Sequence, residues 1–246
     1  MDVRELMHAT AGKTGDIGAA YYFDPATVAK GRELGLDGFR FYIQGRGGAM
    51  GDVSASMVTA AFGYFVPEVI EKMWTSARER LPVVEGAAAY AECNAELGRS
   101  RLCDVDGLDH YCRAANKIVQ NMNPAGLMLF AGYAAQPVPD DTPAKAMHLA
   151  VLLRELRGSA HLMAIVANGL SPAQAHAIKR PGDLELFGYQ KAPELTDADR
   201  AAVVAAEETT DAILESAYAT LTDTERDALV VGTNAMHDAV SAASQE

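Results

Sequence analysis

Three basic residues within one segment are the best candidates for chemistry in this sequence. Arg154, Arg157 and His161 lie in LAVLLRELRGSAHLMAIVANGL, where spacings of three and four residues place them on one helix face beside Gly158. A guanidinium offers paired donors to a carboxylate, a phosphate or a developing oxyanion, and an imidazole transfers protons near neutral pH. The pattern predicts a site for an anionic or carbonyl-bearing ligand, with His161 as the catalytic proton donor or acceptor.

Both faces of this predicted helix carry apolar side chains, which is unusual for a solvated helix. The apolar residues of the basic face are Met147, Ala150, Val151 and Ile165, and those of the opposite face are Leu149, Leu152, Leu153, Leu156 and Met163. We therefore expect a helix covered on both sides, in which Gly158 admits a neighbouring group. Buried cations need partners, and either internal carboxylates such as Glu155 or a bound ligand would supply them.

Arg46 is a second candidate ligand-binding residue. The glycines of GRGG, residues 45–48, predict a tight turn whose exposed backbone amides could line an anion site, the alternative being an arginine on a surface loop. Aromatic side chains nearby predict either pocket walls or simple core. They are Tyr21, Tyr22, Phe39, Phe41, Tyr42, Phe62, Tyr64 and Phe65, of which Tyr42 and Tyr64 join the candidate ligand-binding residues together with Glu155 and Gly158.

The composition is that of a folded, acidic, helical protein. Hydrophobic residues make up 49% and charged residues 22% of 246, and aromatics are modest at 7%. The formal net charge of −12 disfavours a nucleic-acid partner. No stretch approaches the roughly 18 apolar residues of a membrane span, and three cysteines without metal-ligand spacing favour a reducing compartment. We expect a cytoplasmic protein without membrane contact.

Common cofactor and metal motifs are missing from the sequence. It contains no GxGxxG, P-loop, GxSxG or HExxH, and its six histidines are dispersed. Haem ligation by His161 or His148 has no sequence signal of its own. We therefore predict neither a cofactor nor a metal.

Helix signals occur along the whole chain. Residues 25–34, 67–80, 86–97 and 106–121 are expected to be helical, and Thr142 is expected to cap a helix of about 26 residues that ends at Asn168-Gly169. Further helices begin after Ser171, Thr196 and Thr222. The proline-rich stretch 134–143 predicts a joint between residues 1–133, with a degenerate helix-turn-helix, and residues 134–246, with the Arg/His helix and a long C-terminal helix pair.

Two segments resemble a known family. YFDPATVAKGRELGLDGFRFYIQGRGGAMGDVSASMVTAAFGYFVPEVI and LAVLLRELRGSAHLMAIVANGL are similar to motifs of actinobacterial helix-turn-helix proteins that read like YFxPE…LGLxGFWxGYFAxRAAPLGPVxAxVVxATFYNFxP and LLREHRGDGHVAALxxAGL. The likeness covers about 90 residues and includes the six candidate residues Arg46, Arg154, Glu155, Arg157, Gly158 and His161. Leu156, Ser159 and Tyr64 replace His, Asp and Asn of the motif, and these departures favour a divergent activity.

The C-terminal stretch LTDADRAAVVAAEETTDAILESAYATLTDTERDAL is similar, more weakly, to the last two helices of MarR-type winged-helix regulators. The resemblances imply a mainly α fold of two pseudo-winged-helix-like halves packed as one compact unit, and a homodimer. DNA binding is the obvious implication, yet the would-be recognition helix SASMVTAAFGYF contains no Lys or Arg for phosphate contacts.

Three functions remain open on this basis. The first is a protein that binds a small organic ligand, anionic or carbonyl-bearing, in an internal pocket. If this protein is an enzyme, we expect a cofactor-free isomerase, cyclase or lyase that acts by proton transfer. The second is a MarR-type ligand-responsive transcriptional regulator. The third is a structural protein in which the basic helix is part of an internal ion-pair network.

Overall fold

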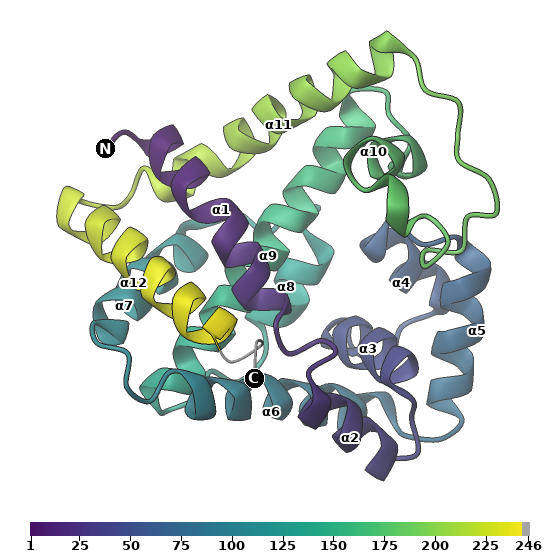
Figure 1. Cartoon of the computed structure of the whole chain (residues 1–246), viewed down its shortest axis with the longest axis horizontal. Helices are drawn as coiled ribbons and strands as arrows, with labels where there is room; N and C mark the ends of the chain where they lie inside the picture. The colour runs from purple at the N-terminus through teal and green to yellow at the C-terminus, as the bar shows by residue number, and fades with distance from the viewer. Residues whose placement is uncertain (243–246) are drawn as a thin grey trace.

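The chain folds into α-helices. The computed structural model describes residues 1–242, and within them it contains helices and no strand, which confirms the predicted mainly α, compact fold (Figure 1). The helices are α1 (Val3–Ala19), α2 (Pro25–Glu33), α3 (Gly38–Gly47), α4 (Ala55–Phe62), α5 (Pro67–Arg78), α6 (Val83–Arg101), α7 (Leu108–Asn121), α8 (Met128–Ala134), α9 (Thr142–Ala167), α10 (Pro172–Lys179), α11 (Asp197–Tyr218) and α12 (Asp223–Ala242), with short 3-10 helices at Gly48–Met50 and Pro181–Asp183.

Helix α9 is the centre of the fold. It packs against α1, α6, α7, α8 and α11, and residues 146–153 are all buried, so both faces of its first half are covered as predicted (Figure 1). Its last turns are different. Ala164 and Ile165 pack toward α10 and α11, whereas Met163, expected to pack with the leucines, is 41% exposed because these two helices cover the other side.

Local signals place most of the helix starts. Asp24 accepts a hydrogen bond from the amide of Ala26 at the start of α2, with Pro25 in the first turn. Helices α10 and α11 begin after Ser171 and Thr196 as expected, and each of these starts has a capping box. The predicted cap of α9 is wrong by one residue, because the carboxylate of Asp141 and not the hydroxyl of Thr142 accepts from Ala144.

The glycine-rich segment around Arg46 is helical, which corrects the predicted tight turn. Residues 38–47 form α3, so their amides are largely used by helical hydrogen bonds and are not free for an anion. The glycines instead allow close packing on α6. A Cβ on Gly45 would lie 2.2 Å from the ring of Tyr90, and one on Gly48 would lie 3.0 Å from the Cβ of Ala87.

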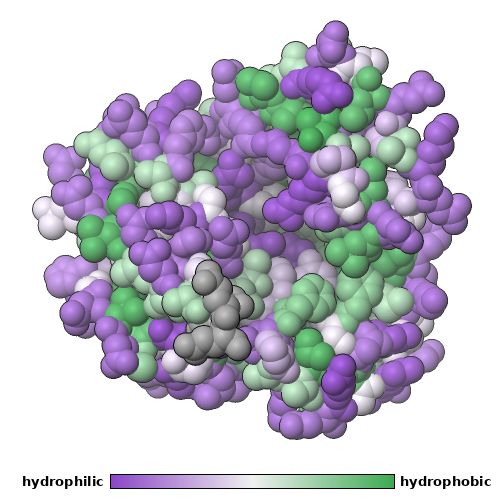
Figure 2. Space-filling model, viewed as in Figure 1, coloured by the Kyte–Doolittle hydropathy of each residue, from purple (hydrophilic) through white to green (hydrophobic). Residues whose placement is uncertain are grey.

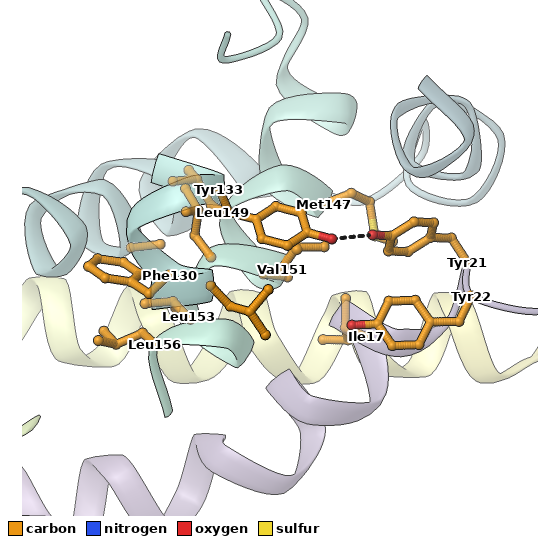
Figure 3. Close-up of a cluster of buried hydrophobic side chains, with 14 of the residues drawn as sticks. Ile17, Tyr21, Tyr22, Phe130, Tyr133, Met147, Leu149, Val151, Leu153 and Leu156 are labelled. Atoms are coloured by element: carbon orange, nitrogen blue, oxygen red, sulfur yellow. Dashed lines mark hydrogen bonds between the residues drawn. The ribbon is translucent and has the colours of Figure 1, made fainter. Parts of the chain in front are cut away.

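One hydrophobic core contains residues from both sides of the proline-rich stretch 134–143. It extends from Leu6 in α1 to Val240 in α12. Figure 3 shows part of it, where Tyr21 follows α1 and its hydroxyl lies 3.3 Å from that of Tyr133 in α8. The division into residues 1–133 and 134–246 stays a prediction, and its last four residues, 243–246, lie outside the described part. No described helix is long and apolar enough to cross a bilayer.

Candidate functional site

A cavity of about 600 Å³ is lined by residues of α1, α3, α4, α9, α10 and α11. Figure 2 shows the molecule hollowed at this place, between the helices that Figure 1 labels α1 and α9 and those labelled α3, α4 and α10. The walls contain Arg46, Arg154, Arg157, Gly158, His161, Tyr42 and Tyr64, seven of the eight residues that the sequence singled out. The fold therefore brings the basic residues of α9 and Arg46 of α3 to one partly open cavity.

Glu155, the eighth candidate, lies behind the cavity wall and holds two of the arginines. Its two oxygens accept hydrogen bonds from Nε and Nη2 of Arg46 at 3.0 and 2.8 Å. Oε1 also accepts from Nη1 of Arg154 at 2.7 Å and from the hydroxyl of Tyr22 at 2.9 Å. Four hydrogen bonds saturate this fully buried carboxylate. Glu155 thus orients the two arginines, and their remaining donors are available to a ligand in the cavity.

The charge of Glu155 is stabilised by this arrangement. Burial opposes its ionisation, but the two guanidinium groups of Arg46 and Arg154 and the hydrogen bonds that it accepts lower its pKa to about 2. Burial also works against the charge of Arg46, yet Glu155 raises the pKa of that guanidinium. All three groups are therefore charged at neutral pH, and the trio carries a net positive charge.

A second carboxylate, Glu207 of α11, holds two further cations at the other end of the cavity. It accepts from Nη2 of Arg157 at 2.7 Å and from Nζ of Lys179 at 2.5 Å. Burial raises the pKa of Glu207, but these two hydrogen bonds and nearby His161 lower it to about 2. Two cations again share one carboxylate. These four cations thus share only two carboxylates, in a protein whose overall net charge is −12.

His161 is held by a hydrogen-bond chain that fixes its tautomer. The hydroxyl of Thr210 lies 2.6 Å from the carbonyl oxygen of Ala206, to which it must donate. Its oxygen, 2.9 Å from Nδ1 of His161, therefore accepts, and the proton of neutral His161 is on Nδ1. Burial lowers the pKa of His161, Arg157 and Lys179 lower it further, and Glu207 opposes them. Nε2 is then an unprotonated nitrogen at neutral pH.

Aromatic side chains form the wall opposite α9. Phe62, Tyr64, Phe65 and Phe187 line the cavity, and the Cζ atom of Arg46 lies 4.4 Å from the ring centre of Phe62. Burial and the charge of Glu207 raise the pKa of Tyr64 to about 12, so its hydroxyl is neutral. A charged end and an aromatic side together suit a ligand with an anionic group on an apolar body.

One detail of the prediction is corrected by the packing. Gly158 was expected to admit a neighbouring group, but a Cβ at this position would meet nothing within 4 Å and would point into open space. The close approach to α9 occurs at Gly18 of α1, where a Cβ would lie 2.9 Å from the side chain of Arg154. Gly158 therefore enlarges the cavity.

Several cavity residues were missed by the sequence analysis. They are Asp16, Ser159, His176, Lys179, Arg180, Phe187, Glu207 and Tyr218, together with Thr210 behind His161. Lys179-Arg180 at the end of the predicted helix after Ser171 was a usable signal. Glu207 was not detectable, because it is one of many acidic residues on α11. Among residues 1–242, no cluster of metal-ligating side chains is present.

The chain matches one known family. The model of a helix-turn-helix family matches residues 7–190, three quarters of the chain, while no curated protein and no solved structure matches. The helix-turn-helix part of the sequence resemblance is confirmed, and an actinobacterial origin stays a prediction. The matched region includes the cavity helices from α1 to α10 and ends before Glu207 and Thr210 on α11.

Proposed function

The chain belongs to a helix-turn-helix family, and we propose that it binds a small organic anion with an apolar or aromatic body in the cavity beside α9. One observation carries the proposal. Four cations, Arg46, Arg154, Arg157 and Lys179, share two carboxylates beside a cavity of about 600 Å³. An anion in the cavity would complete the charge balance.

Unused donors support this assignment. Arg154 donates to Glu155 through Nη1 alone, and Arg157 donates to Glu207 through Nη2 alone. Each guanidinium carries five N–H donors in a planar fork, so most donors of both side chains stay available to a ligand. A carboxylate or phosphate would accept two of them at once. The carboxylates Glu155 and Glu207 hold the forks in place before the ligand arrives, which lowers the ordering cost of binding.

The structural alternative makes a different prediction. If the arginines served only as an internal ion-pair network, the wild-type protein would bind no anion, and replacement of an arginine would change stability alone. Glu207, however, keeps Lys179 when Arg157 is replaced. Replacement of Arg157 by Met should therefore abolish anion binding and shift the melting temperature by only a few degrees.

The regulator alternative is favoured by the family match, and the placement of the helices works against it. The predicted recognition helix corresponds to α4, which has only eight residues and no Lys or Arg. The preceding helix α3 is buried from Phe41 to Gly47 and cannot enter a DNA groove. Fluorescence anisotropy with random-sequence duplex DNA at low salt tests this point. We expect no binding, and a complex that weakens steeply with added salt would support a regulator.

Isothermal titration calorimetry with matched probes tests the proposed function. We expect 2-naphthoate to bind and the neutral 2-naphthalenemethanol to bind at least tenfold more weakly, because only the former satisfies the cations. Arg157→Met should lose the carboxylate preference, and Arg78→Met, which breaks an ion pair with Asp52 outside the cavity, should not. Equal binding of both probes, or no binding of naphthoate, benzoate or phenyl phosphate, would refute the proposal.

A further inference from the structure

We propose that the cavity is a catalytic site in which Nε2 of His161 removes a proton from carbon next to a carbonyl group, in a substrate that also carries a carboxylate. This inference rests on the proposed anion site and adds a reaction to it. Its substrate class is an enolisable keto acid with an apolar or aromatic body. The reaction is proton transfer between carbon and oxygen or between two carbons, with no change of oxidation state overall.

The orientation of His161 carries the first step of the argument. Nδ1 donates to Thr210 at 2.9 Å, and the Thr210 hydroxyl is committed to the Ala206 carbonyl. Nε2 of His161, in contrast, has no hydrogen-bond partner among residues 1–242. This atom is also not buried, so it is accessible to a ligand. Since His161 lines the cavity, a neutral imidazole presents a free lone pair there. A general base needs this state.

The other titratable groups of the cavity are unsuited to this role. Glu155 is saturated with hydrogen bonds, and Glu207 is held by two cations with its pKa at about 2. Asp16 is an exposed carboxylate whose side chain is 76% accessible at the rim. His176 also has an unpartnered Nε2, but that atom is buried between aromatic rings and closed to a substrate. His161 therefore stands apart as a neutral, accessible base.

Formation of an enolate also requires positive charge beside the developing oxyanion, and cations near His161 supply it. Arg157 lies one helical turn from His161 on α9, and both it and Lys179 reach the same Glu207, whose carboxylate is 3.9 Å from Nδ1 of His161. A carbonyl oxygen that gains negative charge in this part of the cavity would accept hydrogen bonds from their free donors. Arg154 lies one turn further along α9 and is available to the substrate carboxylate.

The proposed step is balanced within the substrate and His161. The C–H bond next to the carbonyl breaks, its proton forms a bond to Nε2, and its electron pair forms the carbon–carbon double bond of an enolate. The carbonyl oxygen becomes an oxyanion held by Arg157. The imidazolium then returns the proton to the enolate oxygen or to a carbon atom, which restores neutral His161. Neither an oxidant nor a cofactor is required.

Exchange of a carbon-bound proton with solvent measures this step directly. The probe is sodium phenylpyruvate, a keto acid with an aromatic body, and proton NMR in D₂O follows the loss of its C3 proton signal. We expect the protein to accelerate exchange above the buffer rate and His161→Gln to lose at least 100-fold of that acceleration. The rate should fall on acidification below the usual imidazole range, because burial disfavours protonation of His161 more than Glu207 favours it and so lowers its pKa.

Thr210 provides a matched test of positioning. Thr210→Val removes the acceptor for Nδ1, so His161 can take the other tautomer, and we expect exchange to slow at least tenfold and its pH profile to shift. Thr210→Ser keeps the hydroxyl and should restore both. Calorimetry with phenylpyruvate separates the two proposals. Binding without accelerated exchange would refute the catalytic inference alone, whereas absence of binding and of exchange would count against the anion site as well.

Discussion

Gly18 of α1 lies directly against the side chain of Arg154 of α9. A Cβ on Gly18 would be 2.9 Å from both Cβ and Cδ of Arg154 and 3.0 Å from the backbone oxygen of Ala150. The absence of a side chain at one residue of α1 therefore sets how closely α1 approaches α9, and it fixes the position of an arginine that borders the cavity.

Replacement of Gly18 by Ala should displace Arg154 and weaken anion binding. The backbone oxygen of Ala150 cannot move easily, so we expect a loss of about 1–3 kcal/mol in the free energy of unfolding, measured by urea denaturation. Gly15→Ala is the matched control on the same helix, because a Cβ there meets nothing within 4 Å. It should stabilise the protein by up to about 1 kcal/mol. Equal effects of the two substitutions would contradict this packing argument.

Gly158 allows the cavity itself to be tested. Gly158→Ala should raise the free energy of unfolding by roughly 0.5–1 kcal/mol, because the position is helical and its Cβ meets no atom. Gly158→Leu should fill part of the cavity and lower the affinity for 2-naphthoate at least tenfold, as measured by calorimetry, while the melting temperature stays at or above that of the wild type. Unchanged affinity in the leucine variant would place the ligand elsewhere.

Loss of the Glu155 charge should destabilise the fold. Glu155→Gln leaves Arg46 and Arg154 without their shared carboxylate, and we expect a loss of about 3–5 kcal/mol in the free energy of unfolding. Glu215→Gln, at an exposed ion pair with Arg4, is the control and should cost about 1 kcal/mol or less. If Glu155→Gln lowered the free energy of unfolding as little as the control does, the ion pairs of Glu155 with Arg46 and Arg154 would not be needed for stability.

The same carboxylate should make stability depend on pH at the acidic end. Folding lowers the pKa of Glu155 to about 2 from an unfolded value of 4.5, so the unfolded state binds more protons between these values. The stabilisation is complete above about pH 4.5 and is lost as the pH falls toward 2. Denaturation curves across this range should therefore have a shallower pH dependence in Glu155→Gln than in the wild type.

Protonation of His148 should lower the stability of the fold at a higher pH than protonation of Glu155 does. Burial on α9 lowers its pKa from 6.5 to about 4, and its Nε2 is buried without a partner. Because the unfolded chain takes up this proton first, stability is complete above pH 6.5 and declines as the pH falls toward 4, by up to about 3 kcal/mol. His148→Leu should remove this decline, whereas replacement of the exposed His110 by Leu should not.

The sequence by itself determined most of the helices and the composition of α9. Helix starts depend on caps within a few residues, such as Asp24 before Pro25, and these contacts are local. Helical spacing also places Arg154, Arg157 and His161 near one another, because residues three and four apart share a face whatever surrounds them. The predicted homodimer stays a prediction, which light scattering of the purified protein would test.

Tertiary structure alone decided what these side chains contact. Arg46 reaches Glu155 across 109 residues of sequence, and His161 reaches Thr210 across 49. No local pattern marks Glu207 or Thr210 among the acidic and hydroxyl residues of α11, because ion pairing and the choice of a histidine tautomer depend on distances between helices. The identity of the basic residues follows from the sequence, while the cavity, the shared carboxylates and the free nitrogen of His161 exist only once α1, α9 and α11 have packed.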